Sequence, residues 1–484
     1  SALLRAMSAP PPLPTRSLLL GPSPYTRRLL SCGFDSQHRA VLGHAHDLAS
    51  GGPPSLRLPV PSPVPAAAGL RVSGVAAGAV HSLLVTEGGA VYSWGSSKFG
   101  ALGHGVDCDG RKVERQFEPR RVEALAGVRV VMVAASPSHG GWGLDYSHSL
   151  AVADDGAVFS WGAGKDSRLG HGSSNDVHTP RRIDALKKQR IASVAAGENH
   201  SVALSNEGRV YSWGSGRWGQ LGHGSLRNAR LPRAVDALRD VWVCSVACGC
   251  YHNLALAWEG GVYSWGSGAH PLEHRKQDDV KLLPPTLVGG QLRGERVRSI
   301  AAAELHNLAV TEDGAVFSWG DATFGKLGHG NLVDWPAPRR VEALRGTQVG
   351  AVATGPRHSL AVAADGRVFG WGFGDDTLGL RAFHKTAPVY GACAVASSAA
   401  AAASAAVPPP LPPPLPPLLS LYPPSGYPTL PYSHPAVDPR QGQLGAGGGS
   451  GGGWRPPRPA PSVGSSFCLL TPTEYPRFIR LATE

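Results

Sequence analysis

The stretch from His306 to Gly320 reads HNLAVTEDGAVFSWG, and variants of it occur six times along the 484-residue chain. In each copy a histidine is followed thirteen residues later by a Trp-Gly pair. Because a single catalytic centre needs only one set of residues, a motif present six times indicates a structural repeat rather than a catalytic site. The six anchors are His81/Trp94, His148/Trp161, His200/Trp213, His252/Trp265, His306/Trp319 and His358/Trp371.

Each copy has the residue pattern of a β-hairpin that continues into a loop. Val210–Trp213 alternates as a strand does, and Glu207-Gly208 before it suits a tight turn. A Gly-rich loop containing Leu-Gly-His-Gly follows in four copies, and a proline comes 19 residues after the tryptophan in three. We expect a last strand, such as Arg339–Leu344, to complete each unit. The unit is therefore predicted to contain four short strands.

The period of the repeat selects the fold. Successive Trp-Gly anchors lie 67, 52, 52, 54 and 52 residues apart. Four short strands cannot bury both of their faces alone, so the units must stack radially around an axis. The spacing exceeds the roughly 40–45 residues of Trp-Asp repeats.

The pattern VAAGxxHSLAVxxDGxVYSWGxGxxGxLGHG resembles the regulator of chromosome condensation repeat family over residues 29–390. The resemblance implies an all-β fold, a seven-bladed β-propeller of four-stranded blades. Six strong copies leave one blade to be found. Leu29–Gly33 aligns with Val91–Gly95, and Ser465–Thr471 resembles His81–Thr86. We expect strands from both ends of the chain to complete this seventh blade and close the ring.

Composition divides the rest of the chain. Residues 1–28 contain Arg and Ser but no acid, which favours either an organellar transit peptide or a disordered tail. The first interpretation predicts a mitochondrial or chloroplast location, and the second a cytoplasmic or nuclear one. Residues 391–464 are Ala/Pro/Gly-rich and of low complexity, so we expect a long disordered insertion or tail. Residues 465–484 form the C-terminal segment that is expected to close the last blade.

Charge, cysteine spacing and hydropathy argue against nucleic-acid binding, a zinc site and a membrane span. The formal net charge is +11, but the basic excess lies mainly in the two tails and leaves residues 61–380 nearly neutral. Direct nucleic-acid binding is therefore not supported. The spacing of Cys244, Cys248 and Cys250 matches no standard zinc pattern, and we expect buried thiols there. No apolar run reaches the roughly 18–20 residues that would span a membrane.

The sequence contains no P-loop and no HExxH motif. We therefore predict no enzyme activity, no catalytic residues, no cofactor and no metal. The six repeated histidines would be spread around the ring, and each is expected to bond to backbone within its own blade. The histidines of the Leu-Gly-His-Gly loops are expected to have structural roles; they are His104, His171, His223 and His329.

The family resemblance leaves three functions to compare. One is a non-enzymatic protein-interaction scaffold, which we predict. The second is a guanine-nucleotide exchange factor for a small GTPase, for which the insert 138–146 in the 67-residue unit is the candidate wedge. The third is an ultraviolet-B photoreceptor, whose Gly-Trp-Arg-His-Thr signature is missing because the corresponding positions Gly197–Ser201 lack tryptophan. A transit peptide would favour an organellar RNA or ribosome assembly as the partner.

Candidate partner-binding residues lie in loops, where recognition residues usually occur on a rigid scaffold. Four of them occupy equivalent tips of the loops after Trp-Gly, and two belong to the insert. Aromatic and Arg side chains are favoured as binding hot spots, although packing against the blade edges would also explain the aromatic ones. The candidates are Phe99, Arg217, Trp218 and Phe324 in the loop tips, and Trp142 and Tyr146 in the insert.

Overall fold

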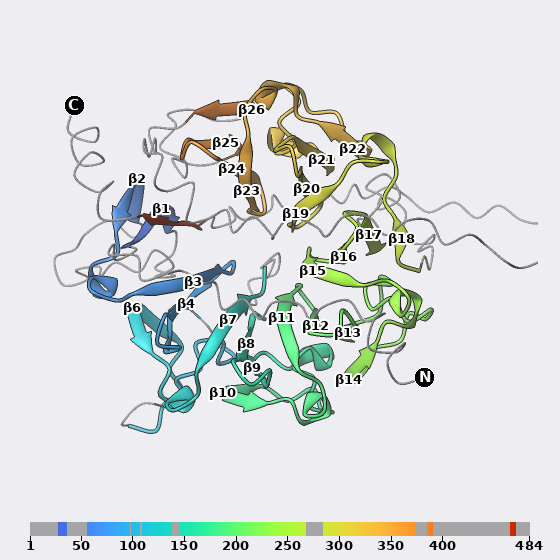
Figure 1. The fold of residues 1–484 in the computed structure, drawn as a ribbon. Coiled ribbons are helices and arrows are strands. Elements are labelled where there is room, and N and C mark those ends of the chain that lie inside the picture. Colours follow the sequence, from blue (N-terminus) through green and yellow to red (C-terminus); the bar gives the residue numbers. More distant parts are fainter. Residues whose placement is uncertain are drawn as a thin grey trace, which may run out of the picture. The chain divides into compact units, whose positions relative to one another are not determined.

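The computed structural model describes residues 28–35, 56–96, 98–106, 109–137, 146–267, 284–373, 385–390 and 465–470. All of them belong to one compact unit. Their regular structure consists of β-strands and three-residue 3-10 helices, arranged as a β-propeller (Figure 1). No helix within these ranges is both long and apolar enough to span a membrane.

Six antiparallel four-stranded sheets form the ring, and each repeat unit supplies one of them. The inner strands are β3 (Val72–Ala77), β7 (Val130–Ala135), β11 (Ile191–Ala196), β15 (Val243–Cys248), β19 (Val297–Ala302) and β23 (Val349–Thr354). The second strands are β4 (His81–Thr86), β8 (His148–Ala153), β12 (His200–Ser205), β16 (His252–Ala257), β20 (His306–Thr311) and β24 (His358–Ala363).

The third strands carry the Trp-Gly pairs, and the fourth strands lie at the outer edge of the ring. The third strands are β5 (Val91–Ser96), β9 (Val158–Gly162), β13 (Val210–Gly214), β17 (Val262–Gly266), β21 (Val316–Gly320) and β25 (Val368–Gly372). The outer strands are β6 (Arg115–Arg121), β10 (Val177–Arg182), β14 (Ala229–Ala234), β18 (Thr286–Leu287), β22 (Trp335–Arg340) and β26 (Lys385–Tyr390).

Local residue chemistry explains where the strands turn and end. Gly208 has φ +73° in the turn between β12 and β13, a conformation that residues with a Cβ rarely adopt. Pro180 and Pro232 lie in the outer strands β10 and β14, where the missing N–H breaks no bond to a further strand. Proline would not be tolerated in a central strand of the sheet, where its missing N–H would leave a ladder bond unmade.

The hydrophobic core lies between neighbouring sheets. Trp213 is fully buried and shares one cluster with Leu150 and Val152 of the preceding sheet. Its indole N–H donates to the carbonyl of Arg168 at 2.8 Å. Leu186 of a 3-10 helix completes the same cluster. The 3-10 helices are η2 (Pro65–Ala67), η3 (Glu123–Leu125), η4 (Lys165–Ser167), η5 (Asp184–Leu186), η6 (Asp236–Leu238), η8 (Gly290–Leu292), η9 (Thr323–Gly325) and η10 (Glu342–Leu344).

The predicted last strand, Arg339–Leu344, is wrong in its bounds. The outer strand β22 ends at Arg340, and Glu342–Leu344 form η10 instead. Leu344 is buried there against Val349 of the next inner strand. The apolar residue that suggested a continuing strand therefore packs between sheets from a helical turn.

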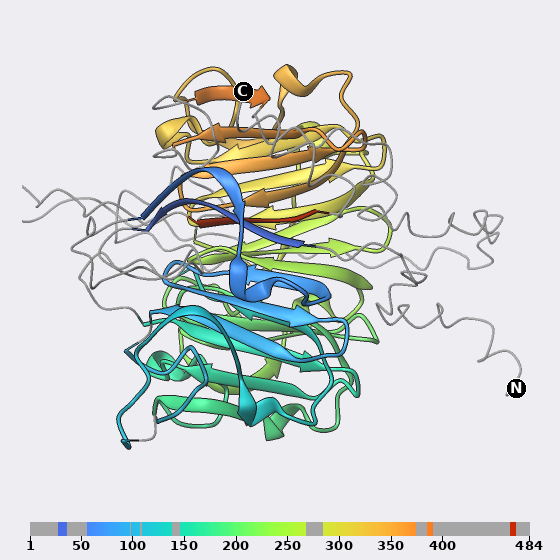
Figure 2. The same cartoon turned by 90° about the vertical axis from the view of Figure 1, so that its left-hand side faces the viewer.

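The expectation of seven four-stranded blades is corrected by the structure. The seventh sheet has three strands among the described residues, in the order β2 (Leu56–Pro63), β1 (Arg28–Asp35) and β27 (Ser465–Leu470). Figure 2 shows β27 beside β1, so strands from the first and last parts of the sequence pair in this sheet. Gly33 lies opposite Ser465, just as Gly95 lies opposite His81. The described residues therefore form six four-stranded blades and one sheet without an inner strand.

The sequence before β27 offers a physical reason for this difference. Ile191–Ala196 begins nine residues before the start of β12 and forms an inner strand. The residues at the same distance before β27, 456–461, read PPRPAP. Proline has no N–H to donate to a strand ladder. This segment therefore lacks the pattern that supplies the fourth strand elsewhere.

Candidate partner-binding face

One face of the ring collects the loops that the sequence singled out. In an antiparallel sheet the end of the inner strand, the start of the second and the end of the third lie at the same edge. The loops before each histidine and those after each Trp-Gly therefore meet at this edge, which we call the loop face. Phe99 and Trp218 lie in loops of the second kind, and Tyr146 in a loop of the first kind.

A repeated hydrogen-bond network lies directly beneath the loop face and joins each sheet to the next. His81 Nε2 lies 2.8 Å from Ser149 Oγ of the following sheet. Ser149 Oγ itself donates to the carbonyl of Ala101, so the histidine Nε2–H is the donor to the serine. His200 Nε2 makes the corresponding bond to Asn253 Oδ1 at 2.7 Å.

The predicted partners of the repeated histidines were therefore wrong. We expected bonds to backbone within each blade, but His148, His252 and His306 also contact a Ser or Asn side chain of the next sheet. Burial lowers the pKa of His81, His200 and His358 to about 4. These three histidines are consequently neutral near pH 7, and His81 and His200 join neighbouring sheets in that form. Among the described residues, no group of three or more His, Cys, Asp and Glu side chains is arranged to hold a metal ion.

The histidines of the Leu-Gly-His-Gly loops hold these loops against their own sheets. Each Nε2 lies within hydrogen-bonding distance of the serine that precedes the tryptophan, as between His104 and Ser93 at 2.9 Å. The other three pairs are His171 with Ser160, His223 with Ser212 and His329 with Ser318. Burial, followed by the charge of Arg120, lowers the pKa of His104 to about 4.

Two buried cations support the loop face, and sequence reasoning missed both. Arg168 has no exposed surface and donates to the carbonyls of Tyr146 and Glu198. Burial lowers its pKa to about 10, so it remains charged near pH 7. Lys326 is also buried and forms an ion pair with Asp321 at 3.0 Å. Both are the seventh residue after a repeat tryptophan, which is the signal that could have identified them.

The structure brings several predicted residues into aromatic pairs across sheet junctions. Phe99 stacks on Tyr146, with ring centroids 4.7 Å apart. Trp218 lies against Tyr251 at 5.8 Å. Each pair joins the loop after one Trp-Gly to the loop before the next histidine. All four rings are half-buried, so they both pack against neighbours and present surface.

The structure places the remaining candidate partner-binding residues in different surroundings. Phe324 lies 5.2 Å from Phe373 in the next sheet and is half-buried. Arg217 is exposed beside Trp218. Trp142 lies outside the described residues, as does the insert apart from Tyr146. The sequence did not identify Tyr251 or Phe373, because neither position is aromatic in most of the repeats.

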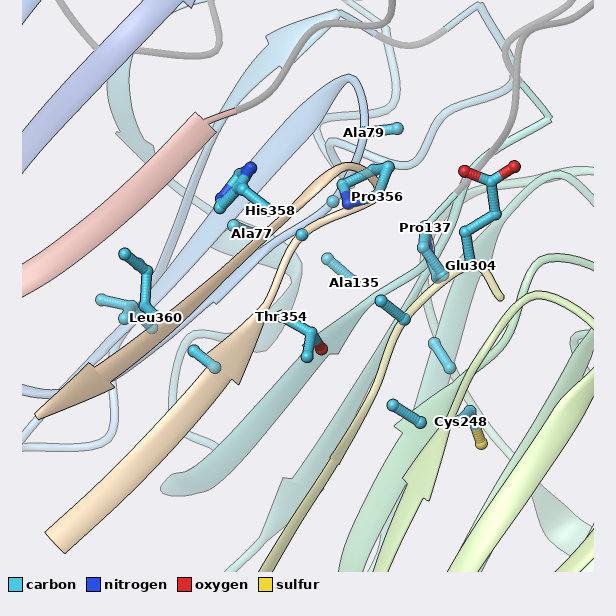
Figure 3. A pocket seen from close by; sticks show the side chains of 17 residues that line it. Ala77, Ala79, Ala135, Pro137, Cys248, Glu304, Thr354, Pro356, His358 and Leu360 are labelled. Atoms are coloured by element: carbon cyan, nitrogen blue, oxygen red, sulfur yellow. The ribbon is translucent and has the colours of Figure 1, made fainter. Parts of the chain in front are cut away.

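A cavity of about 300 Å³ lies where the inner strands end at the centre of the ring (Figure 3). Small side chains line most of it, and Glu304 contributes a carboxylate. His358 and Leu360 of β24 also line it, although they belong to a second strand. The cavity is lined by the last residue of every inner strand in the six blades: Ala77, Ala135, Ala196, Cys248, Ala302 and Thr354.

The ring of repeats described above matches a known family over most of the chain. The model of the RCC1-like domain matches residues 28–405. The chain belongs to the RCC1-like domain family. This RCC1-like chain is 38% identical over 297 residues to the human E3 ubiquitin-protein ligase HERC2, and 35% identical over 304 residues to the ultraviolet-B receptor UVR8 of Arabidopsis thaliana.

The extent of these matches limits what they imply. The HERC2 match covers 60% of this RCC1-like chain and 6% of the ligase. The UVR8 match covers 63% of the chain and 65% of the receptor. Among solved structures, Prp20p of Saccharomyces cerevisiae, described with its binding to Gsp1p and histones, is similar with a TM-score of 0.61 and 25% identity. That similarity covers 76% of this chain and 86% of Prp20p.

Proposed function

We propose that this RCC1-like chain is a non-enzymatic scaffold that holds a protein partner on its loop face. The main supporting observation is the recurrence of half-buried aromatic pairs at three sheet junctions of that face. Aromatic side chains supply a large contact area with little loss of conformational entropy. The similarity to HERC2 covers a small part of that ligase, and it does not carry ligase activity to this chain.

Exposed apolar side chains in the same loops as Phe99, Trp218 and Phe324 support the same face. Val106 is 58% exposed, Leu226 43% and Leu332 60%. All three follow a Leu-Gly-His-Gly sequence in a loop of the loop face. Their recurrence at related positions is typical of an interaction surface rather than of isolated exposed residues.

The experiment compares two sets of apolar substitutions in the full chain. Replacing Val106, Leu226 and Leu332 together by Ser should abolish co-purification of the main partner from the native host. Replacing Leu231 of β14 and Leu287 of β18, which are exposed on outer strands, serves as the matched control and should retain the partner. Retention by the loop-face variant, or equal loss from both variants, would contradict the proposal.

Guanine-nucleotide exchange is the second candidate, because Prp20p binds Gsp1p and because Tyr146 at the end of the insert is held against Phe99. A purified full chain that exchanges nucleotide should accelerate nucleotide release from one member of a panel of small GTPases. Deleting residues 138–145 should remove this acceleration. If the intact chain accelerates none of them, exchange activity is rejected and the scaffold proposal is unaffected.

The compartment remains a proposal as well. The acid-free, Arg-containing start of the chain supports import into a mitochondrion or chloroplast. Residues 1–34 fused to a fluorescent protein should then direct it to that organelle. Diffuse cytoplasmic or nuclear fluorescence would favour the alternative and remove the argument for an organellar RNA or ribosome assembly as partner.

A further inference from the structure

Three exposed cations occupy the same place in the loops after Trp-Gly. Lys98, Lys165 and Arg217 each stand four residues after a repeat tryptophan, and each side chain is exposed on the loop face. For Lys165 and Arg217, the backbone N–H two residues after the cation bonds to the carbonyl one residue before it. Both cations are therefore the first central residues of equivalent turns, at the tips of their loops.

The three cations lie in neighbouring sheets of the ring. Lys98 is in a loop of the sheet β3–β6, Lys165 in one of β7–β10 and Arg217 in one of β11–β14 (Figure 1). Hydrogen bonds from the repeat histidines join each of these sheets to the next. The sequence has no cation at this position in the three later units, where the residues are Ala269, Thr323 and Asp375. The positive loop tips are therefore confined to one side of the loop face.

The acids near these tips offset a buried cation instead. Asp166 follows Lys165, but its carboxylate lies 4.0 Å from the buried guanidinium of Arg168 and also accepts a hydrogen bond from Asn228. Burial lowers the pKa of Arg168, and the charges of Asp166 and Glu198 oppose that shift. These two carboxylates therefore act on the guanidinium beneath the loops.

The exposed cations have no such counter-charge. Among the described residues, none of Lys98, Lys165 and Arg217 forms an ion pair. The ammonium of Lys165 lies 4.6 Å from the centroid of the Tyr146 ring, which is uncharged. Further along the loop of Lys98, residues 109–115 contain three bases and two acids, so they add no negative excess. The described part of this side therefore carries an excess of positive charge at its surface.

The same loops show which anionic partner fits this charge. Nucleic acids bind where cations stand beside open aromatic platforms, but Phe99 and Tyr146 stack on each other with centroids 4.7 Å apart. The first and third loops instead expose the apolar side chains of Val106 and Leu226. Apolar surface beside cations suits a protein segment better than a phosphate backbone.

We propose that the loop tips with Lys98, Lys165 and Arg217 bind an acidic segment of the protein partner, whose apolar residues contact Val106 and Leu226. This inference rests on the proposed scaffold function and specifies the chemistry of the partner. Opposite charges across an interface guide association and fix its orientation. Because exposed charges are screened by salt, the binding should weaken as the salt concentration rises.

The test measures fluorescence polarisation of a labelled, end-capped peptide with three copies of Gly-Asp-Leu-Glu, titrated with the full chain. The same peptide with Asn and Gln in place of Asp and Glu is the neutral control. Lys98→Gln, Lys165→Gln and Arg217→Gln together should weaken binding about tenfold. Lys98→Arg with Lys165→Arg keeps the charge and should change the affinity less than about twofold.

A matched control removes three other exposed cations and leaves the loop face intact. Lys187, Lys188 and Arg190 lie between β10 and β11, at the opposite edge of the sheets, and form no ion pair within the described part of the chain. Lys187→Gln, Lys188→Gln and Arg190→Gln together give the same change in net charge and should alter the affinity less than about twofold. Equal weakening by both triple variants, or equal binding of the neutral peptide, would overturn the inference.

The same assay decides against nucleic acid or for it. Tighter binding of a labelled oligothymidylate than of the acidic peptide would replace the acidic segment with a nucleic acid and so overturn the inference, as would a lack of peptide binding. If the triple loop-tip variant still co-purifies the partner that the Val106, Leu226 and Leu332 variant loses, the scaffold proposal stands and only the acidic-partner inference falls.

Discussion

Two neighbouring junctions of the ring differ although their local sequences agree. Between the sheets β19–β22 and β23–β26, Leu308 is fully buried in a cluster that includes Val349 and Trp371 of the next sheet. At the next junction, towards the three-stranded sheet, Leu360 occupies the same position in β24 but is half-buried and lines the central cavity. The described residues of the three-stranded sheet include no inner strand to cover it.

The difference teaches that burial in this fold depends on the neighbouring unit and not on the unit itself. HNLAVT and HSLAVA place the same leucine on the same face of a second strand. The strands of the following sheet decide whether that leucine leaves water. We therefore expect the closing junction to be the least stable part of the ring.

Acidification should produce the largest effect and weaken the ring at several junctions. The pKa of His81, His200 and His358 is about 4 in the folded chain and near 6.5 when unfolded, so the unfolded chain binds more protons between these values. The contribution of these neutral histidines to stability is fully present above pH 6.5. The free energy of unfolding falls by about 3 kcal/mol for each such histidine as the pH drops to 4. Hydrogen exchange at pH 5 should rise first in β23 and β24, and uniform exchange around the ring would contradict the expected weakness of the closing junction.

Trp213→Ala should destabilise an interior junction strongly. The change removes a fully buried ring and its bond to the Arg168 carbonyl, at a cost of about 3–5 kcal/mol. Urea unfolding followed by circular dichroism measures the change. Trp213→Phe is the control and should cost less, because the ring volume is largely kept while the N–H donor is lost. Equal effects would assign the stability to the hydrogen bond alone.

A matched pair of leucine substitutions compares the two junctions directly. Leu308→Ala should cost about 2–5 kcal/mol, because a cavity forms in a closed cluster. Leu360→Ala should cost less than about 1.5 kcal/mol, since its side chain already borders a cavity. The two urea midpoints are compared under one set of conditions. Equal losses would mean that the closing junction is as well packed as the interior one.

Removal of an exposed ion pair should have the smallest effect on stability, and two such pairs in different sheets should behave alike. Arg71 and Glu87 lie 4.0 Å apart beside β3 and β4, and Arg296 and Glu312 lie 3.4 Å apart at the same positions beside β19 and β20. Both pairs are exposed, so Arg71→Ala and Arg296→Ala should each cost less than about 1 kcal/mol. A larger loss for one of them would show that an exposed ion pair contributes measurably to stability at that place in the ring.

The repeat made much of the fold predictable, because its signals are local. The hairpin at Gly208 and the strand ending at Trp213-Gly214 require only short-range geometry, and both occur in the structure. The bounds of β22 were misjudged, because an apolar residue on a helical turn looks like the next residue of a strand. The number of four-stranded blades was also misjudged, since it depends on segments far apart in the chain.

The candidate site was predictable in its location but not in its contacts. Phe99, Trp218 and Phe324 could be placed in equivalent loops by counting from the tryptophans. Their partners Tyr146, Tyr251 and Phe373 follow no shared position in the repeat. The partners come from the next unit and are brought near only by the stacking of sheets.

By itself, the sequence determined the β-propeller class, the period of the units and the turns within them, because hydrogen bonds and apolar alternation act over a few residues. Only the tertiary structure decided which side chain each histidine binds, where Arg168 and Lys326 are buried, and where the central cavity opens. The bond from His200 to Asn253 joins residues 53 positions apart, and the bonds from Arg168 to Tyr146 and Glu198 join residues 22 and 30 positions apart. Their geometry exists only once neighbouring sheets pack together around the ring.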